Sequence, residues 1–288
     1  MKRLILVLIT ITINTAVWSQ KVTLDKVSYE SYSTFKSVAV EIKIDGVKLD
    51  TINRIKLLGN AFAYIIKSKE YISDSFYSDE YQDNSDNKYT IVFDSISKQI
   101  NNFEKVTGTL RYFHPSTYDK SIVVIENAKN TFNSNVLSKN SDEIKVIPIN
   151  GLILHKLNKR KKKLRKYLDG IILKNRLDRN LFIETLSKHF DNYKDFNSLN
   201  KLSDFIIFYI EQPHFKVVSI HLEDSNNKNR TGYYSVEINS KLNGPKSAIW
   251  ISSNFGKKLN DDYKIEIRYE NKNSIRDFEF ELSNLQLN

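Results

Sequence analysis

The stretch Tyr263-Lys264-Ile265-Glu266-Ile267-Arg268-Tyr269 carries the clearest pattern in the chain, because large apolar side chains alternate with charged ones. Successive side chains of a β-strand point to opposite faces of its sheet, so this stretch predicts a strand whose apolar side chains face a core. The odd-numbered side chains should therefore be buried, while the charged side chains between them face water.

The same alternation recurs on both sides of this strand. After it comes Phe278-Glu279-Phe280-Glu281-Leu282. Before it lie three further short runs, Val218 to Leu222, Tyr234 to Ile238 and Ile249 to Ile251. Several short strands separated by polar turns are typical of β-sandwiches, so we expect residues 214–288 to form a small immunoglobulin-like sandwich.

A period of two also dominates residues 21–150. Val38, Val40, Ile42 and Ile44 alternate with other side chains until Gly46 ends the run. Four further runs continue the pattern: 89–93, 106–112, 122–125 and 144–149. These runs predict an N-terminal antiparallel β-sandwich over residues 21–150. Residues 52–66 fit either a strand or one face of a helix.

Between the two predicted sandwiches, residues 151–213 change to helical spacing. The apolar positions of the first helix are Ile153, Leu154, Leu157, Leu164, Leu168 and Ile171. Asp178 is suited to cap a second helix, and Ser198 a third helix that ends before Pro213. The predicted fold is therefore mainly β with an α segment: two antiparallel β-sandwich modules joined by a short helical subdomain.

The N-terminus has the three parts of a secretory signal peptide. Met1, Lys2 and Arg3 are followed by the apolar run Leu4 to Ile13, and Ser19 is a small residue at a suitable cleavage position. We expect residues 1–20 to be a signal peptide and the protein to be exported, either periplasmic or secreted; the alternative is a buried N-terminal strand. No apolar run is long enough for a transmembrane span.

Composition excludes several classes of site. The chain has no cysteine, so disulfides, thiolate zinc sites and a lipidated N-terminal cysteine are impossible. No GxSxG, HExxH, Walker or GxGxxG pattern is present. The five histidines lack local metal-site spacing: His114, His155, His189, His214 and His221. We therefore predict no catalytic, cofactor-binding or metal-binding residue and no cofactor.

Three weaker patterns fit either a site or ordinary surface. Adjacent carboxylates lie in expected turns at 79–80, 142–143, 223–224 and 261–262, where aspartate is also favoured for backbone hydrogen bonds. The oxygen-rich run from Asp79 to Asn87 could ligate calcium, but it lacks the EF-hand glycine and terminal glutamate. Tyrosines and phenylalanines in irregular segments could stack on sugar or peptide: Tyr29, Tyr32, Tyr71, Phe76, Tyr77, Tyr81 and Tyr118.

The positive charge of the protein is concentrated in one segment. The formal net charge is +10. Residues 21–150 carry 17 basic and 17 acidic side chains, whereas residues 151–213 carry 14 basic and 7 acidic ones. The densest basic cluster is predicted to bind an anionic lipid or lipopolysaccharide surface: Lys159, Arg160, Lys161, Lys162, Lys163, Arg165 and Lys166. The alternative is a solvated helix face, and export makes nucleic acid a poor partner.

Some strand patterns resemble a known group of proteins. In the first region they are Val106-Thr107-Gly108-Thr109-Leu110-Arg111-Tyr112-Phe113-His114-Pro115, Val123-Val124-Ile125-Glu126-Asn127 and Ile144-Lys145-Val146-Ile147-Pro148. In the last region they are Val217-Val218-Ser219-Ile220 and Leu259-Asn260-Asp261-Asp262 before Ile265-Glu266-Ile267. These runs resemble exported bacterial proteins with paired β-sandwich modules, which implies fold and export but no catalytic residue. The basic helical region departs from that pattern.

The sequence leads to two hypotheses about function. The first is an exported, non-enzymatic binding or structural module of the cell envelope or extracellular space, whose partner is an envelope protein, a glycan or an anionic lipid surface. The alternative is a hydrolase acting on cell-wall or extracellular glycan. A hydrolase of this kind needs two carboxylates about 5 to 10 Å apart across a cleft.

The signal peptide leads to a first prediction. Export should remove residues 1–19 or 1–20, because the small residue Ser19 follows the apolar run. Intact-mass spectrometry of the protein from the periplasm or the medium should then find Gln20 or Lys21 at the N-terminus. A chain in that fraction that still begins with Met1 would contradict cleavage.

Overall fold

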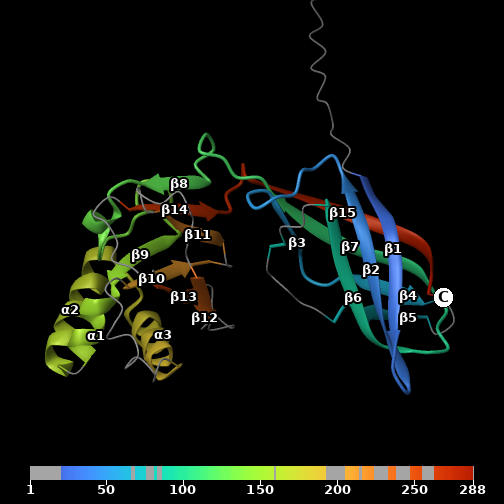
Figure 1. The fold of residues 1–288 in the computed structure, drawn as a ribbon, viewed down its shortest axis with the longest axis horizontal. Coiled ribbons are helices and arrows are strands. Elements are labelled where there is room, and N and C mark those ends of the chain that lie inside the picture. Colours follow the sequence, from blue (N-terminus) through green and yellow to red (C-terminus); the bar gives the residue numbers. More distant parts are fainter. Residues whose placement is uncertain are drawn as a thin grey trace, which may run out of the picture. The chain divides into compact units, whose positions relative to one another are not determined.

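The computed structural model describes residues 21–65, 69–75, 81–82, 86–158, 160–192, 205–213, 216–223, 233–237, 247–254 and 263–287. The chain divides into two compact units (Figure 1). Unit 1 comprises Met1–Arg111 and Asp277–Asn288, and unit 2 comprises Tyr112–Arg276. The fold is mainly β with an α segment and contains several antiparallel sheets, as the sequence predicted.

The first sheet of unit 1 has the order β1-β2-β6. Its strands are β1 (Lys21–Ser31), β2 (Phe35–Asp45) and β6 (Lys88–Ser97). All four apolar side chains at the even positions 38–44 of β2 are fully buried, which confirms the predicted alternation.

The second sheet of unit 1 has the order β15-β7-β4-β5, and β3 also pairs with β7. Its strands are β3 (Arg54–Leu57), β4 (Phe62–Ile65), β5 (Glu70–Ser73), β7 (Asn102–Phe113) and β15 (Ile275–Gln286). The rings of Phe93 on β6 and Phe103 on β7 meet edge to face with centroids 5.3 Å apart, so side chains of both sheets share one core. The ambiguous residues 52–66 contain two strands, β3 and β4.

The last strand, β15, belongs to unit 1 rather than to the expected C-terminal module (Figure 1). A Cβ atom added to Gly108 on β7 would lie 2.8 Å from Cε1 of Phe280, so the glycine makes room for the ring of the neighbouring strand. Nη2 of Arg111 on β7 lies 2.7 Å from Oδ2 of Asp277. The expected module 214–288 therefore contributes strands to both units.

Unit 2 contains two further antiparallel sheets. The central sheet has the order β12-β13-β10-β9, with β9 (Lys145–Asn150), β10 (Phe205–Gln212), β12 (Tyr233–Glu237) and β13 (Ser247–Asn254). The outer sheet has the order β11-β14-β8, with β8 (Ile122–Ile125), β11 (Val217–Glu223) and β14 (Lys264–Tyr269). The short 3-10 helix η1 (Ala128–Thr131) follows β8.

The core between these two sheets contains the strand from which the sequence argument started. Ile265 and Ile267 are fully buried, and Tyr263 and Tyr269 flank them in the same cluster. Ile206, Phe208 and Ile210 contribute to this cluster from the central sheet. The predicted burial of the odd-numbered side chains of residues 263–269 is therefore confirmed. Arg268, which was expected to face water, is instead 2% exposed, and its Nη2 lies 2.6 Å from Oε1 of Glu266.

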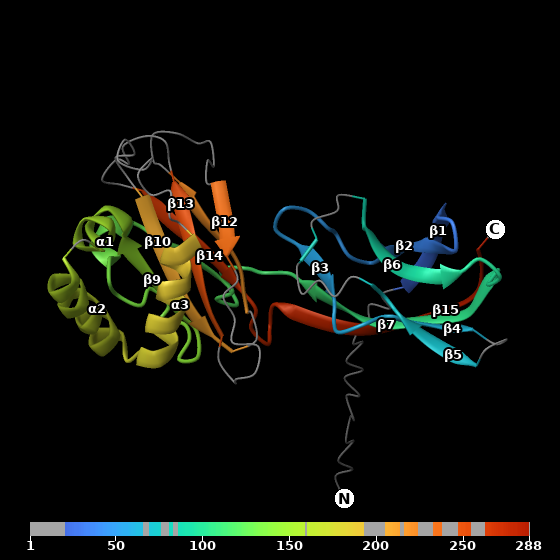
Figure 2. The same cartoon turned by 90° about the horizontal axis from the view of Figure 1, so that it is seen from below.

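Three helices cover the other face of the central sheet (Figure 2). They are α1 (Gly151–Asn158), α2 (Lys161–Asn175) and α3 (Arg179–Asn192). Asp178 caps α3 as predicted, because the backbone N–H of Leu181 donates a hydrogen bond of 3.0 Å to its Oδ1. The helices are one layer of unit 2 and not a subdomain between two modules, since they share a core with β9, β10 and β13.

The predicted third helix is wrong where the structure describes it. Phe205–Gln212 is the strand β10, while Ser198, its expected cap, lies outside the described residues. Ile206, Phe208 and Ile210 face the outer sheet, whereas Ile207 and Tyr209 face the helices. A strand buried on both faces has no polar alternation, so its apolar run also fits a helix.

A buried ionic network joins the strands to the helices. Nζ of Lys145 lies 2.9 Å from Oε1 of Glu211, whose side chain is 2% exposed. The backbone N–H of Asp178 donates to Oε2 of Glu211 at 3.0 Å, and the Tyr209 hydroxyl donates to the same oxygen at 3.3 Å. Burial raises the pKa of Tyr209, and the nearby Glu211 carboxylate raises it further. The carboxylate thus connects β9 and β10 with the turn before α3.

The facing of β14 provides the second prediction. Ile267→Asn should lower the free energy of unfolding by about 3–5 kcal/mol, because it leaves a cavity and buries an amide group without a hydrogen-bond partner. The matched control is Val124→Asn, at an exposed position of the neighbouring strand β8, and should cost less than about 1 kcal/mol. Urea denaturation measures both values, and equal costs would contradict the facing.

The network around Glu211 provides the third prediction. Lys145→Met should lower the free energy of unfolding by about 2–4 kcal/mol, because the Glu211 carboxylate stays buried without its cation. Lys264→Met removes the cation of an exposed pair with Glu126 and should have little effect. Denaturant unfolding of the two variants and the parent makes the comparison. A Lys145→Met protein as stable as the Lys264→Met control would show that the buried pair is unimportant.

Candidate functional site

The predicted basic cluster lies at the start of α2. Lys161, Lys162, Lys163, Arg165 and Lys166 occupy its first turns and are all exposed. None of these five side chains pairs with a carboxylate among the described residues. Arg160 is the exposed residue immediately before the helix, and Lys159 lies outside the described residues.

The position of these cations is unfavourable for the helix itself. A helix N-terminus carries partial positive charge, so each cation there costs about 0.3–1 kcal/mol at low salt. Arg160 at the N-cap makes no side-chain capping hydrogen bond, and the first turn contains no acidic residue. Helix stability therefore does not account for the cluster.

A groove of about 530 Å³ runs along one face of the same helix. Its first wall consists of residues three and four positions apart on α2: Lys163, Lys166, Tyr167, Gly170, Ile171 and Lys174. Its second wall is formed by Phe132 and Asn133, which follow η1. The groove thus combines the basic side of α2 with a loop that lies about thirty residues earlier in the chain.

Hydrogen bonds hold the second wall in place. The Tyr167 hydroxyl donates to Oδ1 of Asn133 at 2.9 Å, and burial raises the pKa of this tyrosine. Nδ2 of Asn175 donates to the backbone oxygen of Asn133 at 3.0 Å. The backbone N–H of Asn133 donates to the oxygen of Pro148 at 2.8 Å. These three hydrogen bonds hold Asn133 against α2 and β9.

The groove is electrostatically one-sided. Lys163, Lys166 and Lys174 line it, whereas none of the lining residues that the structure describes is acidic. Nζ of Lys174 donates to the Ser134 hydroxyl at 2.6 Å, which places this ammonium group at the loop wall. Three ammonium groups around one groove are suited to an anionic ligand.

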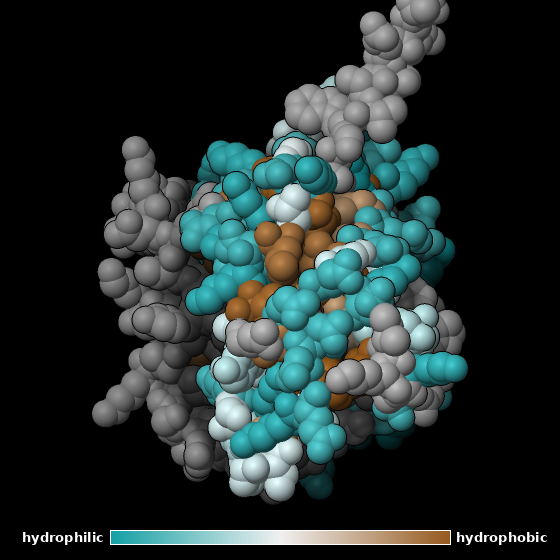
Figure 3. Space-filling view, turned by 90° about the vertical axis from the view of Figure 1, so that its right-hand side faces the viewer, coloured by the Kyte–Doolittle hydropathy of each residue, from teal (hydrophilic) through white to brown (hydrophobic). Residues whose placement is uncertain are grey.

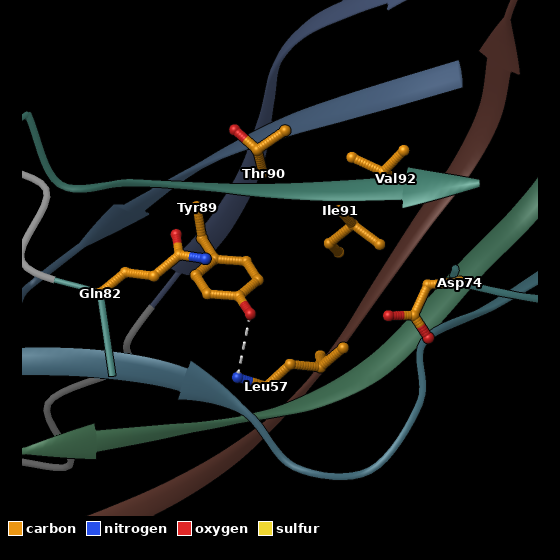
Figure 4. A pocket seen from close by; sticks show the side chains of 7 residues that line it. All are labelled: Leu57, Asp74, Gln82, Tyr89, Thr90, Ile91 and Val92. Atoms are coloured by element: carbon orange, nitrogen blue, oxygen red, sulfur yellow. Dashed lines mark hydrogen bonds between the residues drawn. The ribbon is translucent and has the colours of Figure 1, made fainter. Parts of the chain in front are cut away.

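Unit 1 contains a second pocket, of about 300 Å³, between β3 and β6 (Figure 4). Asp74 and Tyr89 line it, and burial raises the pKa of both groups. The backbone N–H of Ala61 donates to Oδ1 of Asp74 at 2.9 Å, and that of Leu57 donates to the Tyr89 hydroxyl at 3.3 Å. Among the described lining residues Asp74 is the one carboxylate, whereas glycoside hydrolysis uses two.

The described histidines and carboxylates have local structural contacts. His114 is exposed and stacks on Tyr112 with ring centroids 5.8 Å apart, and Nε2 of His221 lies 3.0 Å from the Ser219 hydroxyl. Glu143 pairs with Lys216 at 2.9 Å, which lowers the pKa of Glu143. Within the described part of the chain, no three His, Asp or Glu side chains form a group that could hold a metal ion. The side chains of His155 and His189, and all of His214, lie outside that part.

The calcium hypothesis and most of the adjacent carboxylates fall largely outside the described residues. Of the run from Asp79 to Asn87, the structure describes only 81–82 and 86–87. Oδ1 of Asn87 accepts a hydrogen bond of 2.8 Å from the backbone of Leu49, so this side chain closes a loop. The adjacent carboxylates 79–80 and 261–262 and residue 224 are likewise not described.

Several of the predicted aromatic residues are exposed. Tyr29, Tyr32, Tyr71 and Tyr118 are exposed, while Phe76 and Tyr77 lie outside the described residues. Nζ of Lys56 lies 4.5 Å from the ring centroid of Tyr81. Figure 3 shows apolar surface between hydrophilic side chains on the side of unit 1 that it presents. None of the described rings, of Tyr29, Tyr32, Tyr71, Tyr81 and Tyr118, is among the described residues that line the groove or the pocket of unit 1.

Sequence reasoning found the basic cluster but not the groove beside it. Tyr167, Gly170 and Lys174 share the face of α2 that begins at Lys163, and their spacing of three and four residues is visible in the sequence. The second wall was not visible, because nothing in the sequence pattern pairs Asn133 with Tyr167 or Asn175.

No protein-family model matches this chain, and no curated protein matches it. Among the helices that the structure describes, none is long and apolar enough to cross a membrane. The function must therefore be argued from the geometry and charge of α2 and its groove.

Proposed function

We propose that the protein is exported and acts as a non-enzymatic binding module, which contacts anionic, phosphate-bearing surfaces of the cell envelope through the basic end of α2. The observation that carries this proposal is the exposed group Lys161, Lys162, Lys163, Arg165 and Lys166, which has no acidic partner among the described residues. Near an anionic membrane each such charge contributes about 1 kcal/mol.

The placement of the cluster supports binding rather than stability. Cations at a helix N-terminus oppose the helix dipole, whereas a bound anion there is favourable. A phosphate-bearing surface would offset the mutual repulsion of these side chains and their unfavourable position. Such attraction depends on ionic strength, because the Debye length is about 10 Å at 0.1 M salt.

The predicted export of the protein supports the same class of partner. The charged start, apolar run and small residue at 1–20 predict export, and the strand patterns resemble those of exported bacterial proteins with paired sandwich modules. An exported protein meets lipid phosphates and lipopolysaccharide rather than nucleic acid. The envelope surface is therefore the polyanion that we propose.

The fourth prediction tests this surface. Replacing Lys161, Lys162, Lys163 and Lys166 with Gln should weaken binding to vesicles of anionic phospholipid or lipopolysaccharide by about tenfold or more at low salt. The melting temperature should stay equal or rise, because cations leave the helix N-terminus. Vesicle co-sedimentation at low and high salt measures binding, and calorimetry measures melting.

A variant with the same change in net charge controls for nonspecific attraction. Lys26, Lys98, Lys139 and Lys272 are exposed and lie outside α2. Their fourfold replacement with Gln should leave vesicle binding close to that of the parent. Equal binding by the parent and the α2 variant, or equal losses in the two fourfold variants, would contradict the proposal.

A further inference from the structure

A glycine in the middle of α2 is not required by the packing of the protein. Glycine lowers helix stability relative to alanine, because its backbone loses more freedom on folding. A Cβ atom added to Gly170 would meet no atom of the described residues within 4 Å. At Gly108, by contrast, a Cβ atom would lie 2.8 Å from Phe280, so packing explains that glycine. The space at Gly170 is open although a side chain would fit.

That open space is part of the groove beside the basic cluster. Gly170 lies four residues after Lys166 and four before Lys174, so the three residues share one helix face. Tyr167 and Ile171 lie next to it on the same face and also line the groove. Any side chain at position 170 would occupy the groove, and the glycine instead exposes the helix backbone as its floor.

The lining provides two kinds of contact. The ammonium groups of Lys163, Lys166 and Lys174 are suited to a phosphate, since no acidic residue lines the groove within the described part of the chain. Phe132 and Tyr167 provide aromatic surface on which the C–H face of a sugar ring can pack. The volume of about 530 Å³ is in the range of small-molecule sites, which are about 300–1,000 Å³.

We propose that this groove binds a phosphorylated saccharide of the kind carried by envelope glycolipids. The sugar ring lies over Gly170 against Tyr167, and its phosphate lies next to Lys166, while Lys163 and Lys174 add positive charge toward the two ends of the groove. This inference rests on the proposed function, because it names the ligand that the basic side of α2 recognises. Because the groove contacts the sugar ring as well as the phosphate, it distinguishes a sugar phosphate from phosphate alone.

The fifth prediction uses glucose 1-phosphate, inorganic phosphate and glucose as probes in calorimetric titrations of the mature protein. Glucose 1-phosphate should bind about tenfold or more tightly than either of the other two, because only it uses both kinds of contact. Gly170→Leu should weaken its binding by about tenfold or more, because the new side chain fills the groove while every charge remains. Leucine favours helix, so this variant should melt no lower than the parent.

Two variants with the same loss of charge separate the groove from the rest of the protein surface. The groove variant replaces Lys163, Lys166 and Lys174 with Gln and should lose most glucose 1-phosphate binding. The control variant replaces Lys26, Lys98 and Lys272 with Gln, which are exposed and lie outside α2, and should bind within about threefold of the parent, since screened charges act weakly at a distance.

The outcomes distinguish this inference from the proposed function. If glucose 1-phosphate binds no more tightly than inorganic phosphate, or if Gly170→Leu binds it like the parent, the groove inference is wrong. In that case, loss of vesicle binding in the fourfold α2 variant would still support the anionic-surface function. If the groove variant and the control variant lose glucose 1-phosphate binding equally, charge alone attracts it and the groove inference is also wrong.

Discussion

The burial of β10 on both faces is the constraint on which unit 2 depends. Ile206, Phe208 and Ile210 need the outer sheet as cover, and Ile207 and Tyr209 need the helices. The central sheet therefore requires the helical layer as cover. A hydrogen bond also joins the two layers, because Nε1 of Trp250 on β13 donates to the Thr185 hydroxyl of α3 at 2.8 Å. A helix fixed in this way has one buried side and leaves its remaining faces for water or for a ligand. The basic residues of α2 and its groove occupy those remaining faces.

How much of the fold could be predicted depended on how much polar alternation each strand retains. The sequences of β2 and β14 show a period of two, and the burial of their apolar side chains was predicted correctly, although Arg268 on the other face of β14 is buried as well. β10 has no polar face, and its run of apolar residues was therefore mistaken for a helix. β15 has a clear alternation, but alternation says only that one face is buried and not against which strand. Its partner β7 lies more than 160 residues earlier, so the assumption that neighbouring segments pair was misleading.

For the candidate site, too, only the part formed by one continuous stretch of sequence could be predicted. Charge density is a property of a continuous stretch, so the cluster from Lys159 to Lys166 was visible without a structure. A groove requires two walls, and the second wall comes from Phe132 and Asn133, which reach α2 only through the folded sheet and its hydrogen bonds. Nothing in the sequence singled out Gly170. Only the folded structure shows that this residue lines the groove and that the space beside it is open.

The position of β15 has a consequence for the order in which the protein matures. The chain leaves the ribosome, and crosses a membrane if it is exported, from the N-terminus onward, so β7 emerges long before residues 275–286. Until then β7 has an unpaired edge on the side that β15 will occupy, and such edges invite pairing with other chains. Unit 1 starts before unit 2 in the sequence, but it is completed only after the whole of unit 2 has been made. An interruption of synthesis anywhere within unit 2 would leave both units unfinished, so pairing of β15 with β7 requires that unit 2 has already been made.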